Sequence, residues 1–171
     1  RNADPKIVVD VMDRVKTAAQ GAAMITGTKV EFEQTGGVYN LLPNDVLGKV
    51  MQSSLESVGG ITWTPEETKF AQELAKSLPN GGGDLSSVAR VQPYAPADTS
   101  GDAGGGSTDV ADVSWVTPTV GLSTATFVPG SAGHSWQNVA PAGMSIGLKG
   151  AAVAAKTLSL TGAGLLSNPE L

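Results

Sequence analysis

A long apolar stripe near the beginning of the chain most constrains its fold. Asp4-Pro5 has the pattern of a helix N-cap followed by proline at the first helical position, where the missing N–H costs nothing. Apolar residues then recur at helical spacing for about five turns until Gly27. They are Ile7, Val8, Val11, Met12, Val15, Ala18, Ala19, Ala22 and Ile25. One face of this helix must pack against another element, which we expect to be a sheet.

The residues that follow this helix have the pattern of a strand. Residues 28–35 alternate, with Val30 and Phe32 on one side and charged residues on the other, which is typical of a half-buried strand. One helix and one strand cannot bury the apolar stripe, so we expect partner strands before Arg1. A helix followed by an antiparallel strand suits the end of a ferredoxin-like βαββαβ unit.

Three further helices are expected. Asn44 can cap a helix that ends near Gly59-Gly60. Thr64, Pro65 and Glu67 form a capping-box pattern, and this role explains the Glu66-Glu67 pair better than a catalytic one does. The third helix covers Ala142 to Leu160, where glycines 143, 147 and 150 suggest close packing against a sheet.

The remaining segments complete an expected α/β fold. Residues 79–106 are rich in Gly, Pro, Ser and Asp, and a loop this long is either functional or disordered. Residues 113–116 and 120–128 are β-prone and predict strands.

Composition excludes several classes of protein. The net charge is −5, with no Lys/Arg cluster, which argues against binding to nucleic acid or to an anionic membrane. No window approaches the roughly 18 apolar residues of a membrane span. The absence of cysteine excludes disulfides and thiolate metal sites and fits a cytoplasmic protein. The start at Arg1, without methionine or a signal-peptide pattern, suggests that an upstream segment is missing.

His134 is the only histidine and the first candidate for chemistry. A lone histidine is more often an ordinary surface or core residue. This one follows a β-prone run and lies in a glycine-flanked turn, where the backbone can approach a metal or a substrate closely. Imidazole is the commonest metal ligand, but a zinc site needs about three or four protein ligands. Other ligands must therefore come from elsewhere.

The glycine run at 104–106 and the following Ser107-Thr108-Asp109 form a second candidate site. Backbone N–H groups in such a run can bind an anion. The run lacks the Gly-Lys-Ser/Thr ending of a phosphate loop, so a nucleotide-binding module is disfavoured. Asp109 and Asp112 can orient a ligand or cap the next segment equally well. No Gly-x-Ser-x-Gly motif supports a Ser-His-Asp hydrolase.

Several motifs together resemble one enzyme family. They are Gly-Ser-Thr-Asp-Val-x-Asp-Val-Ser-Trp (106–115), Pro-Thr-Val (118–120), Pro-Gly (129–130), His-Ser-Trp-Gln (134–137) and the opening Arg-Asn-Ala-Asp-Pro (1–5). The chain is similar over nearly its whole length to the C-terminal part of the co-catalytic zinc amidohydrolases of the aminoacylase and glutamate-carboxypeptidase type.

The resemblance implies two domains. Family members have an α/β catalytic domain interrupted by a lid domain that also mediates dimerisation. Residues 1–38 would be the last helix and strand of the ferredoxin-like lid. Residues 39–171, with the long loop 79–109, would be the C-terminal part of a catalytic domain in which helices pack on a sheet.

The resemblance also assigns residues. His134 would be the last metal ligand, and Ser107, Thr108 and Asp109 would line the substrate pocket. Arg1 would match a lid arginine that binds the substrate carboxylate. Asn40 would match a polar position near the lid hinge. Relatives often have Gly-His-Lys-Gly where this chain has Gly-Leu-Lys-Gly (147–150), so a second histidine role is unfilled.

The family's other active-site residues are absent. Its His-x-Asp pair, bridging aspartate and Glu-Glu pair lie upstream of the lid, so this chain would contain no catalytic residue. It would be a C-terminal fragment or a split chain that needs the N-terminal part of the catalytic domain and forms a homodimer or hetero-oligomer through the lid. The complete enzyme would use two zinc or manganese ions to hydrolyse a small amide, such as an aminobenzoyl-glutamate-like N-acyl amino acid. The alternative is a non-catalytic binding or assembly module.

Overall fold

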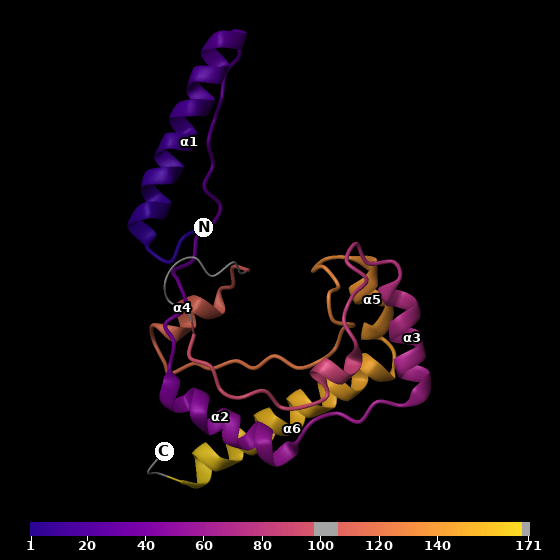
Figure 1. Ribbon diagram of the computed structural model, residues 1–171. Helices are drawn as coiled ribbons and strands as arrows, with labels where there is room; N and C mark the ends of the chain where they lie inside the picture. Colours follow the sequence, from indigo (N-terminus) through magenta and orange to yellow (C-terminus); the bar gives the residue numbers. More distant parts are fainter. Residues whose placement is uncertain (98–105, 169–171) are drawn as a thin grey trace. The chain divides into compact units, whose positions relative to one another are not determined.

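The computed structural model describes residues 1–97 and 106–168. Every regular element in these two ranges is a helix (Figure 1). The helices are α1 (Pro5–Thr26), α2 (Asp45–Val58), α3 (Pro65–Ala75), the 3-10 helix η1 (Leu85–Val88), α4 (Val110–Ser114), α5 (Trp136–Ala142) and α6 (Ser145–Ser167). Among the described residues, every helix is too short or too polar to cross a bilayer.

The chain divides into two compact units. The first consists of Arg1–Asp45 and Pro96–Thr119, and the second of Val46–Ala95 and Val120–Leu171. The division at residue 38 that the resemblance implies stays a prediction.

Helix α1 begins and ends as its sequence predicts. The Asp4 carboxylate accepts a hydrogen bond from the Lys6 backbone N–H at 2.8 Å. Gly27 adopts φ 65 at the C-cap and donates its N–H to the carbonyls of Ala23 and Met24. A left-handed residue at this position satisfies terminal carbonyls, and glycine adopts it without a steric penalty.

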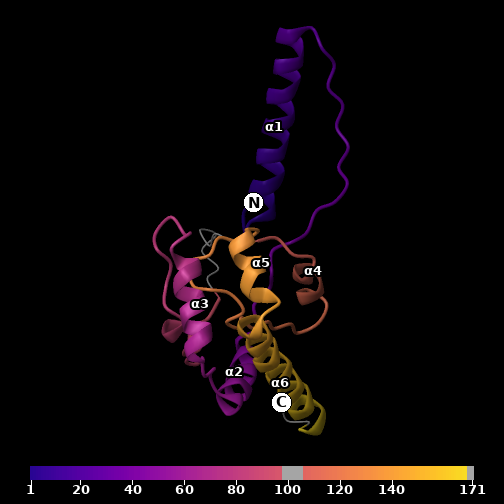
Figure 2. The same ribbon diagram turned by 90° about the vertical axis from the view of Figure 1, so that its right-hand side faces the viewer.

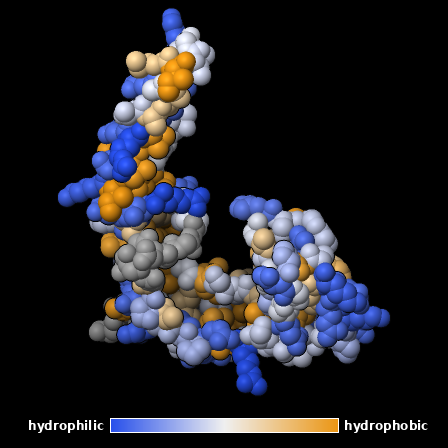
Figure 3. Space-filling view, turned by 45° about the horizontal axis from the view of Figure 1, so that its top comes forward, coloured by the Kyte–Doolittle hydropathy of each residue, from blue (hydrophilic) through white to orange (hydrophobic). Residues whose placement is uncertain are grey.

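The apolar face of α1 is not covered by the described residues. No residue of this helix is buried, and the exposed fractions of Val15 and Ile25 on this face are 57% and 88%. Figure 3 shows hydrophobic side chains gathered on the visible surface of α1. The expected sheet against this face is therefore not found among the described residues.

The predicted strand at 28–35 is wrong. The chain after Gly27 is irregular as far as Asn44, as Figure 2 also shows. A strand needs a neighbour to bond its backbone N–H and C=O groups, and the described residues offer none. The ferredoxin-like end of a lid is consequently not formed there.

The other two predicted strands are wrong as well. Residues 113–116 lie in and just after α4, whose first N–H groups bond locally: Ala111 N to Thr108 O at 3.2 Å and Asp112 N to Asp109 O at 3.0 Å. Residues 120–128 form no regular element. The α/β fold with a sheet is thus contradicted over residues 1–97 and 106–168. β-propensity depends on a neighbouring strand and on burial, and neither run finds a partner strand in these ranges.

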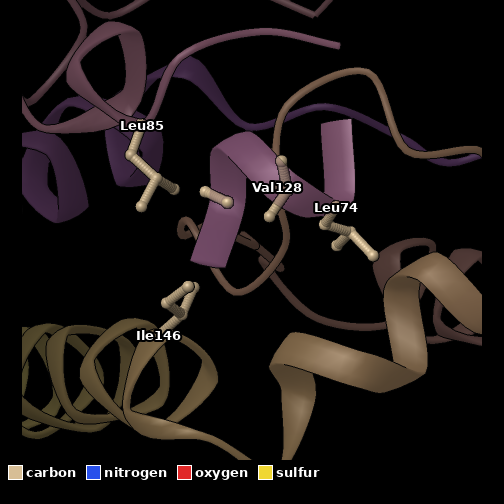
Figure 4. Close-up of a cluster of buried hydrophobic side chains, with 5 residues drawn as sticks. Leu74, Leu85, Val128 and Ile146 are labelled. Carbon is tan, nitrogen blue, oxygen red and sulfur yellow. The ribbon is translucent and has the colours of Figure 1, made fainter. Parts of the chain in front are cut away.

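The core of the second unit joins segments that are far apart in sequence. Figure 4 shows four of its side chains packed together. They are Leu74 of α3, Leu85 of η1, Ile146 of α6, and Val128 of the irregular segment before α5. Leu85, Val128 and Ile146 are each 1% exposed. The Trp63 indole Nε1 donates to the Leu85 carbonyl at 2.9 Å and packs against the same cluster.

Helix α6 confirms the predicted C-terminal helix, although it begins at Ser145 rather than Ala142 and continues to Ser167. Its buried glycines meet backbone as expected, but not the backbone of a sheet. A Cβ at Gly147 would collide with Ala142, and one at Gly150 with the Ala125 carbonyl. A Cβ at Gly143 would meet open space. Residues 120–128 therefore pack against α6 as irregular chain.

Candidate functional site

His134 occupies a left-handed backbone conformation at the surface of the second unit. Its φ is 58, and within the described residues it is the only non-glycine residue with positive φ. Histidine is one of the side chains enriched in this region, at a cost of roughly 1–2 kcal/mol. The residue is exposed and directly precedes Ser135, the N-cap position of α5. The Ser135 hydroxyl donates to the Ala132 carbonyl at 2.6 Å, which closes the turn.

The base of this turn rests on a second glycine-rich loop. Gly83 N–H donates to the Pro129 carbonyl at 2.8 Å. A Cβ at Gly83 would lie 2.8 Å from Pro129 Cβ, and a Cβ at Gly130 would lie 3.0 Å from Gly82 Cα. Gly82 and Gly130 also have positive φ values of 61 and 87. Only glycine allows the two loops to cross this closely, so the crossing fixes the position of the His134 turn.

A hollow of about 480 Å³ lies beside this crossing. Its walls come from the end of the α3 region and from the His134 turn: Leu78, Pro79, Asn80, Gly82, Gly130, Ala132 and Gln137. The hollow was not predicted, because residues 79–106 were interpreted as one loop and a site was expected at 104–106. The informative signal was the Gly81–Gly83 run, which follows α3 and precedes η1.

The predicted substrate residues Ser107, Thr108 and Asp109 lie exposed just before α4 in the first unit. Thr108 Oγ1 accepts from Val110 N at 3.3 Å. Asp109 is the N-cap residue, but its carboxylate makes no capping bond. Gly104 and Gly105 lie outside the described residues, so the predicted anion-binding run is not described as a whole.

Asn40 lies against α4, also in the first unit. The Trp115 indole donates to the Asn40 carbonyl at 2.7 Å, while the Asn40 amide reaches only the Leu41 carbonyl at 3.5 Å. Tyr39 N–H donates to the Asp112 carboxylate at 2.9 Å, and the rings of Tyr39 and Trp115 lie 6.2 Å apart. Asp112 therefore orients the chain around Asn40, a contact that the sequence did not predict.

Arg1 is exposed at the beginning of the chain, in the first unit. His134 belongs to the second unit, whereas Arg1, Asn40 and Ser107–Asp109 belong to the first. The roles of these five residues in substrate binding remain predictions from the resemblance.

The described residues do not make a metal site by themselves. Among them, no group of three or more His, Cys, Asp or Glu side chains is placed to hold a metal ion. His134 can supply one neutral imidazole ligand, which is fewer than the roughly three or four that a zinc site requires. The described residues therefore account for one ligand of a metal ion and not for its complete set of ligands.

An ion pair between the buried carboxylate of Glu67 and the partly exposed Lys149 joins α3 to α6 in the second unit. Lys149 Nζ lies 2.7 Å from Glu67 Oε2 and 2.8 Å from the Thr62 carbonyl, and 5.8 Å from the centre of the Trp63 ring. The predicted capping box is confirmed, because Thr64 N–H donates to the same carboxylate at 2.7 Å.

The environment of Glu67 keeps it ionised. Burial raises its pKa, but hydrogen bonds from Lys149, Ser145 and the Thr64 backbone outweigh burial and lower the pKa to about 2. Ser145 and Lys149 lie in the first turns of α6, and α6 contacts α5 directly. The lysine of the Gly-Leu-Lys-Gly segment thus has a structural partner that the sequence did not reveal.

Comparison with known proteins finds a relative among the hydrolases. No protein-family model and no solved structure matches the chain. It is 32% identical over 187 aligned residues to one of the subunits of p-aminobenzoyl-glutamate hydrolase from Escherichia coli (strain K12). The alignment covers 96% of this chain but only 38% of the relative's length. The chain is therefore similar, along nearly its whole length, to a little over a third of a hydrolase polypeptide, which supports the relation that its motifs indicate.

Proposed function

We propose that this chain forms part of an amide-hydrolysing site that acts on an N-acyl amino acid. The Escherichia coli relative is named for hydrolysis of p-aminobenzoyl-glutamate, which joins an aromatic acyl group to an amino acid through an amide. His134 would bind one of two divalent metal ions, zinc or manganese. The other ligands would come from beyond the described residues or from a partner chain.

The observation that carries this proposal is the conformation of His134. The turn holds His134 at a backbone geometry that most side chains avoid, and Gly130 and Ala132 of the same segment line a hollow. Residues in such conformations persist only where surrounding structure over-determines them, and they cluster at functional sites. The glycine crossing at Gly82, Gly83 and Gly130 provides this constraint.

Bound metal ions in such a site lower the pKa of a water molecule and polarise the amide carbonyl. The part that falls to this chain is to orient His134 and to shape the adjoining surface. We assign none of the described residues as the base that takes a proton from the attacking water.

Replacing His134 with asparagine tests the proposal. Asparagine tolerates the left-handed backbone but removes the imidazole, so we expect roughly a 100-fold fall in hydrolysis of N-benzoyl-glutamate and a loss of bound metal, with an unchanged circular dichroism spectrum. The protein is purified from its own host with any copurifying partner chain, and metal is counted by elemental analysis.

Val139→Ala is the control, because Val139 lies on α5 and is 73% exposed. It should leave activity and metal content unchanged. A His134→Asn protein as active and as metal-rich as the wild type would rule out the ligand role. A wild-type protein that hydrolyses no N-acyl amino acid would reject the function.

The second candidate function is assembly through α1, with a second copy of the chain as the partner. The specific observation is that a helix of 22 residues leaves every apolar side chain unburied among the described residues. Exposed apolar surface of this extent marks interaction sites in soluble proteins. The resemblance to enzymes that dimerise through their lid supports this choice of partner.

Charge on this face is expected to prevent assembly. Val11 and Val15 are 47% and 57% exposed and lie one turn apart, so the double variant Val11→Lys/Val15→Lys places two charges where an interface would bury apolar groups. Light scattering after size-exclusion chromatography should show a fall from dimer to monomer mass. His134→Asn should leave the mass unchanged. Equal masses for wild type and the lysine variant would reject this candidate.

A further inference from the structure

The hollow beside His134 has a neutral lining. Leu78, Pro79 and Ala132 are the larger apolar residues of the lining, and Asn80 and Gln137 are its residues with polar side chains. No charged side chain is among the described residues that form its walls. A carboxylate is recognised by cationic or multiple N–H donors, which this lining does not present. The occupant that fits is an uncharged group with an apolar body.

The size and rigidity of the hollow suit a small organic group. Its volume of about 480 Å³ lies within the range typical of ligand sites, roughly 300–1,000 Å³. The contact of Gly82 and Gly83 with Pro129 and Gly130 holds its two walls together before any ligand arrives. Preformed walls reduce the ordering cost of binding.

The two carboxamides come from different walls. Asn80 follows α3, and Gln137 lies in the first turn of α5. Each offers both a donor and an acceptor, so the pair suits a neutral amine, hydroxyl or carbonyl group. In the described part of the chain, neither side chain makes a hydrogen bond to protein, which leaves both available to a ligand.

The hollow shares one wall with the turn that carries His134. In the chain, His134 lies between two of the lining residues, Ala132 and Gln137. The same turn therefore carries the proposed metal ligand and part of the hollow's wall. We propose that this hollow, between the loop at 78–82 and the His134 turn, binds the uncharged acyl group of the amide substrate and selects for its size; the choice of substrate rests on the proposed function.

Binding of benzamide, a neutral acyl analogue, tests the hollow directly. Calorimetry on the purified protein, with any copurifying chain retained, should show binding of benzamide and much weaker binding of benzoate. Ala132→Phe should weaken benzamide binding about tenfold or more by filling the hollow. Val139→Phe introduces the same aromatic side chain at an exposed position on α5 that does not line the hollow, and it should bind benzamide like the wild type.

Gln137→Leu serves as the second variant, because it removes a polar partner without adding bulk. It should weaken benzamide binding even if Ala132→Phe fails to fold by circular dichroism. The proposal is overturned if benzamide does not bind the wild type, or if folded variants bind it as tightly as the wild type does.

Hydrolysis separates this proposal from the proposed function. Ala132→Phe should lower kcat/KM for N-benzoyl-glutamate about tenfold or more, with little change for N-acetyl-glutamate, whose acyl group is small. An equal fall for both substrates would overturn the role of the hollow while leaving the hydrolase intact. Benzamide binding that responds to the variants, in a wild type that hydrolyses neither substrate, would reject the hydrolase and retain the hollow.

Discussion

Replacing Gly150 with alanine is expected to lower the free energy of unfolding by about 3 kcal/mol. Gly150 is buried on α6, and a Cβ there would lie 2.8 Å from Thr126 Cγ2 and closer still to the Ala125 carbonyl oxygen. The oxygen belongs to the backbone, so relief requires α6 and residues 125–126 to move apart. Such a movement would disturb the core around Val128 and Ile146.

Gly162→Ala provides a matched control on the same helix. A Cβ at Gly162 would meet nothing within 4 Å, so alanine there should raise stability by roughly 0.5–1 kcal/mol through its better helix propensity. Urea denaturation followed by circular dichroism and tryptophan fluorescence measures both variants. If the two substitutions changed stability in the same direction, the close approach of α6 to residues 125–126 would be refuted.

Replacing Lys149 with alanine is the second large expected effect, with a loss of about 3 kcal/mol in unfolding free energy. The Glu67 side chain is only 6% exposed, so the variant leaves a buried carboxylate without its cation. It also removes the donor to the Thr62 carbonyl. The same denaturation experiment reports this change.

An exposed ion pair of the same length is the matched control. Lys76 and Glu73 also lie 2.7 Å apart, but their side chains are 70% and 61% exposed. Solvent screens such pairs, so Lys76→Ala should change stability little. Similar losses for Lys76→Ala and Lys149→Ala would show that burial of Glu67 is not what makes its pair important.

The pH dependence of stability follows from the same carboxylate. Its folded pKa of about 2 lies below the ordinary 4.5, so its stabilising contribution is complete above about pH 4.5 and is lost as pH falls toward 2. Glu67→Gln lacks this titration. The stability difference between wild type and Glu67→Gln should therefore be largest near neutral pH and shrink between pH 4.5 and 2. A constant difference across this range would contradict the lowered pKa.

Both ends of α1 and the beginning of α3 were predictable because their stabilising contacts are local. The Asp4 cap, the Gly27 ending and the Thr64–Glu67 capping box involve residues within about four positions of each other. The short helices α4 and α5 and the 3-10 helix η1 were not predicted, although Asp84 caps η1 through Ser86 N–H at 3.2 Å. The surrounding glycines and prolines concealed such brief elements.

The strands were not predictable, because a β pattern acquires its structure only from a partner strand. Residues 28–35 and 120–128 have suitable alternation or propensity, yet neither finds a neighbouring strand in the described parts of the chain. Residues 113–116 instead form the local hydrogen bonds of α4 and of its C-terminal turn. For these reasons the expected sheet does not form among the described residues.

The candidate site divides in the same way. The glycine-flanked turn around His134 and the relation to a hydrolase were visible in sequence motifs. The crossing of this turn with Gly82 and the neutral hollow could not be predicted from the sequence. About 50 residues separate the two loops, and neither sequence indicates which other segment it contacts.

The sequence by itself determined several helix caps, which residue is the only histidine, and which protein family the chain resembles. Only the tertiary structure decided which segments meet: Gly82 with Gly130, Glu67 with Lys149, and Asn40 with Trp115. The physical reason is range. Capping and turn geometry depend on hydrogen bonds between near neighbours, whereas packing and buried ion pairs depend on distant residues whose proximity exists only in the folded chain.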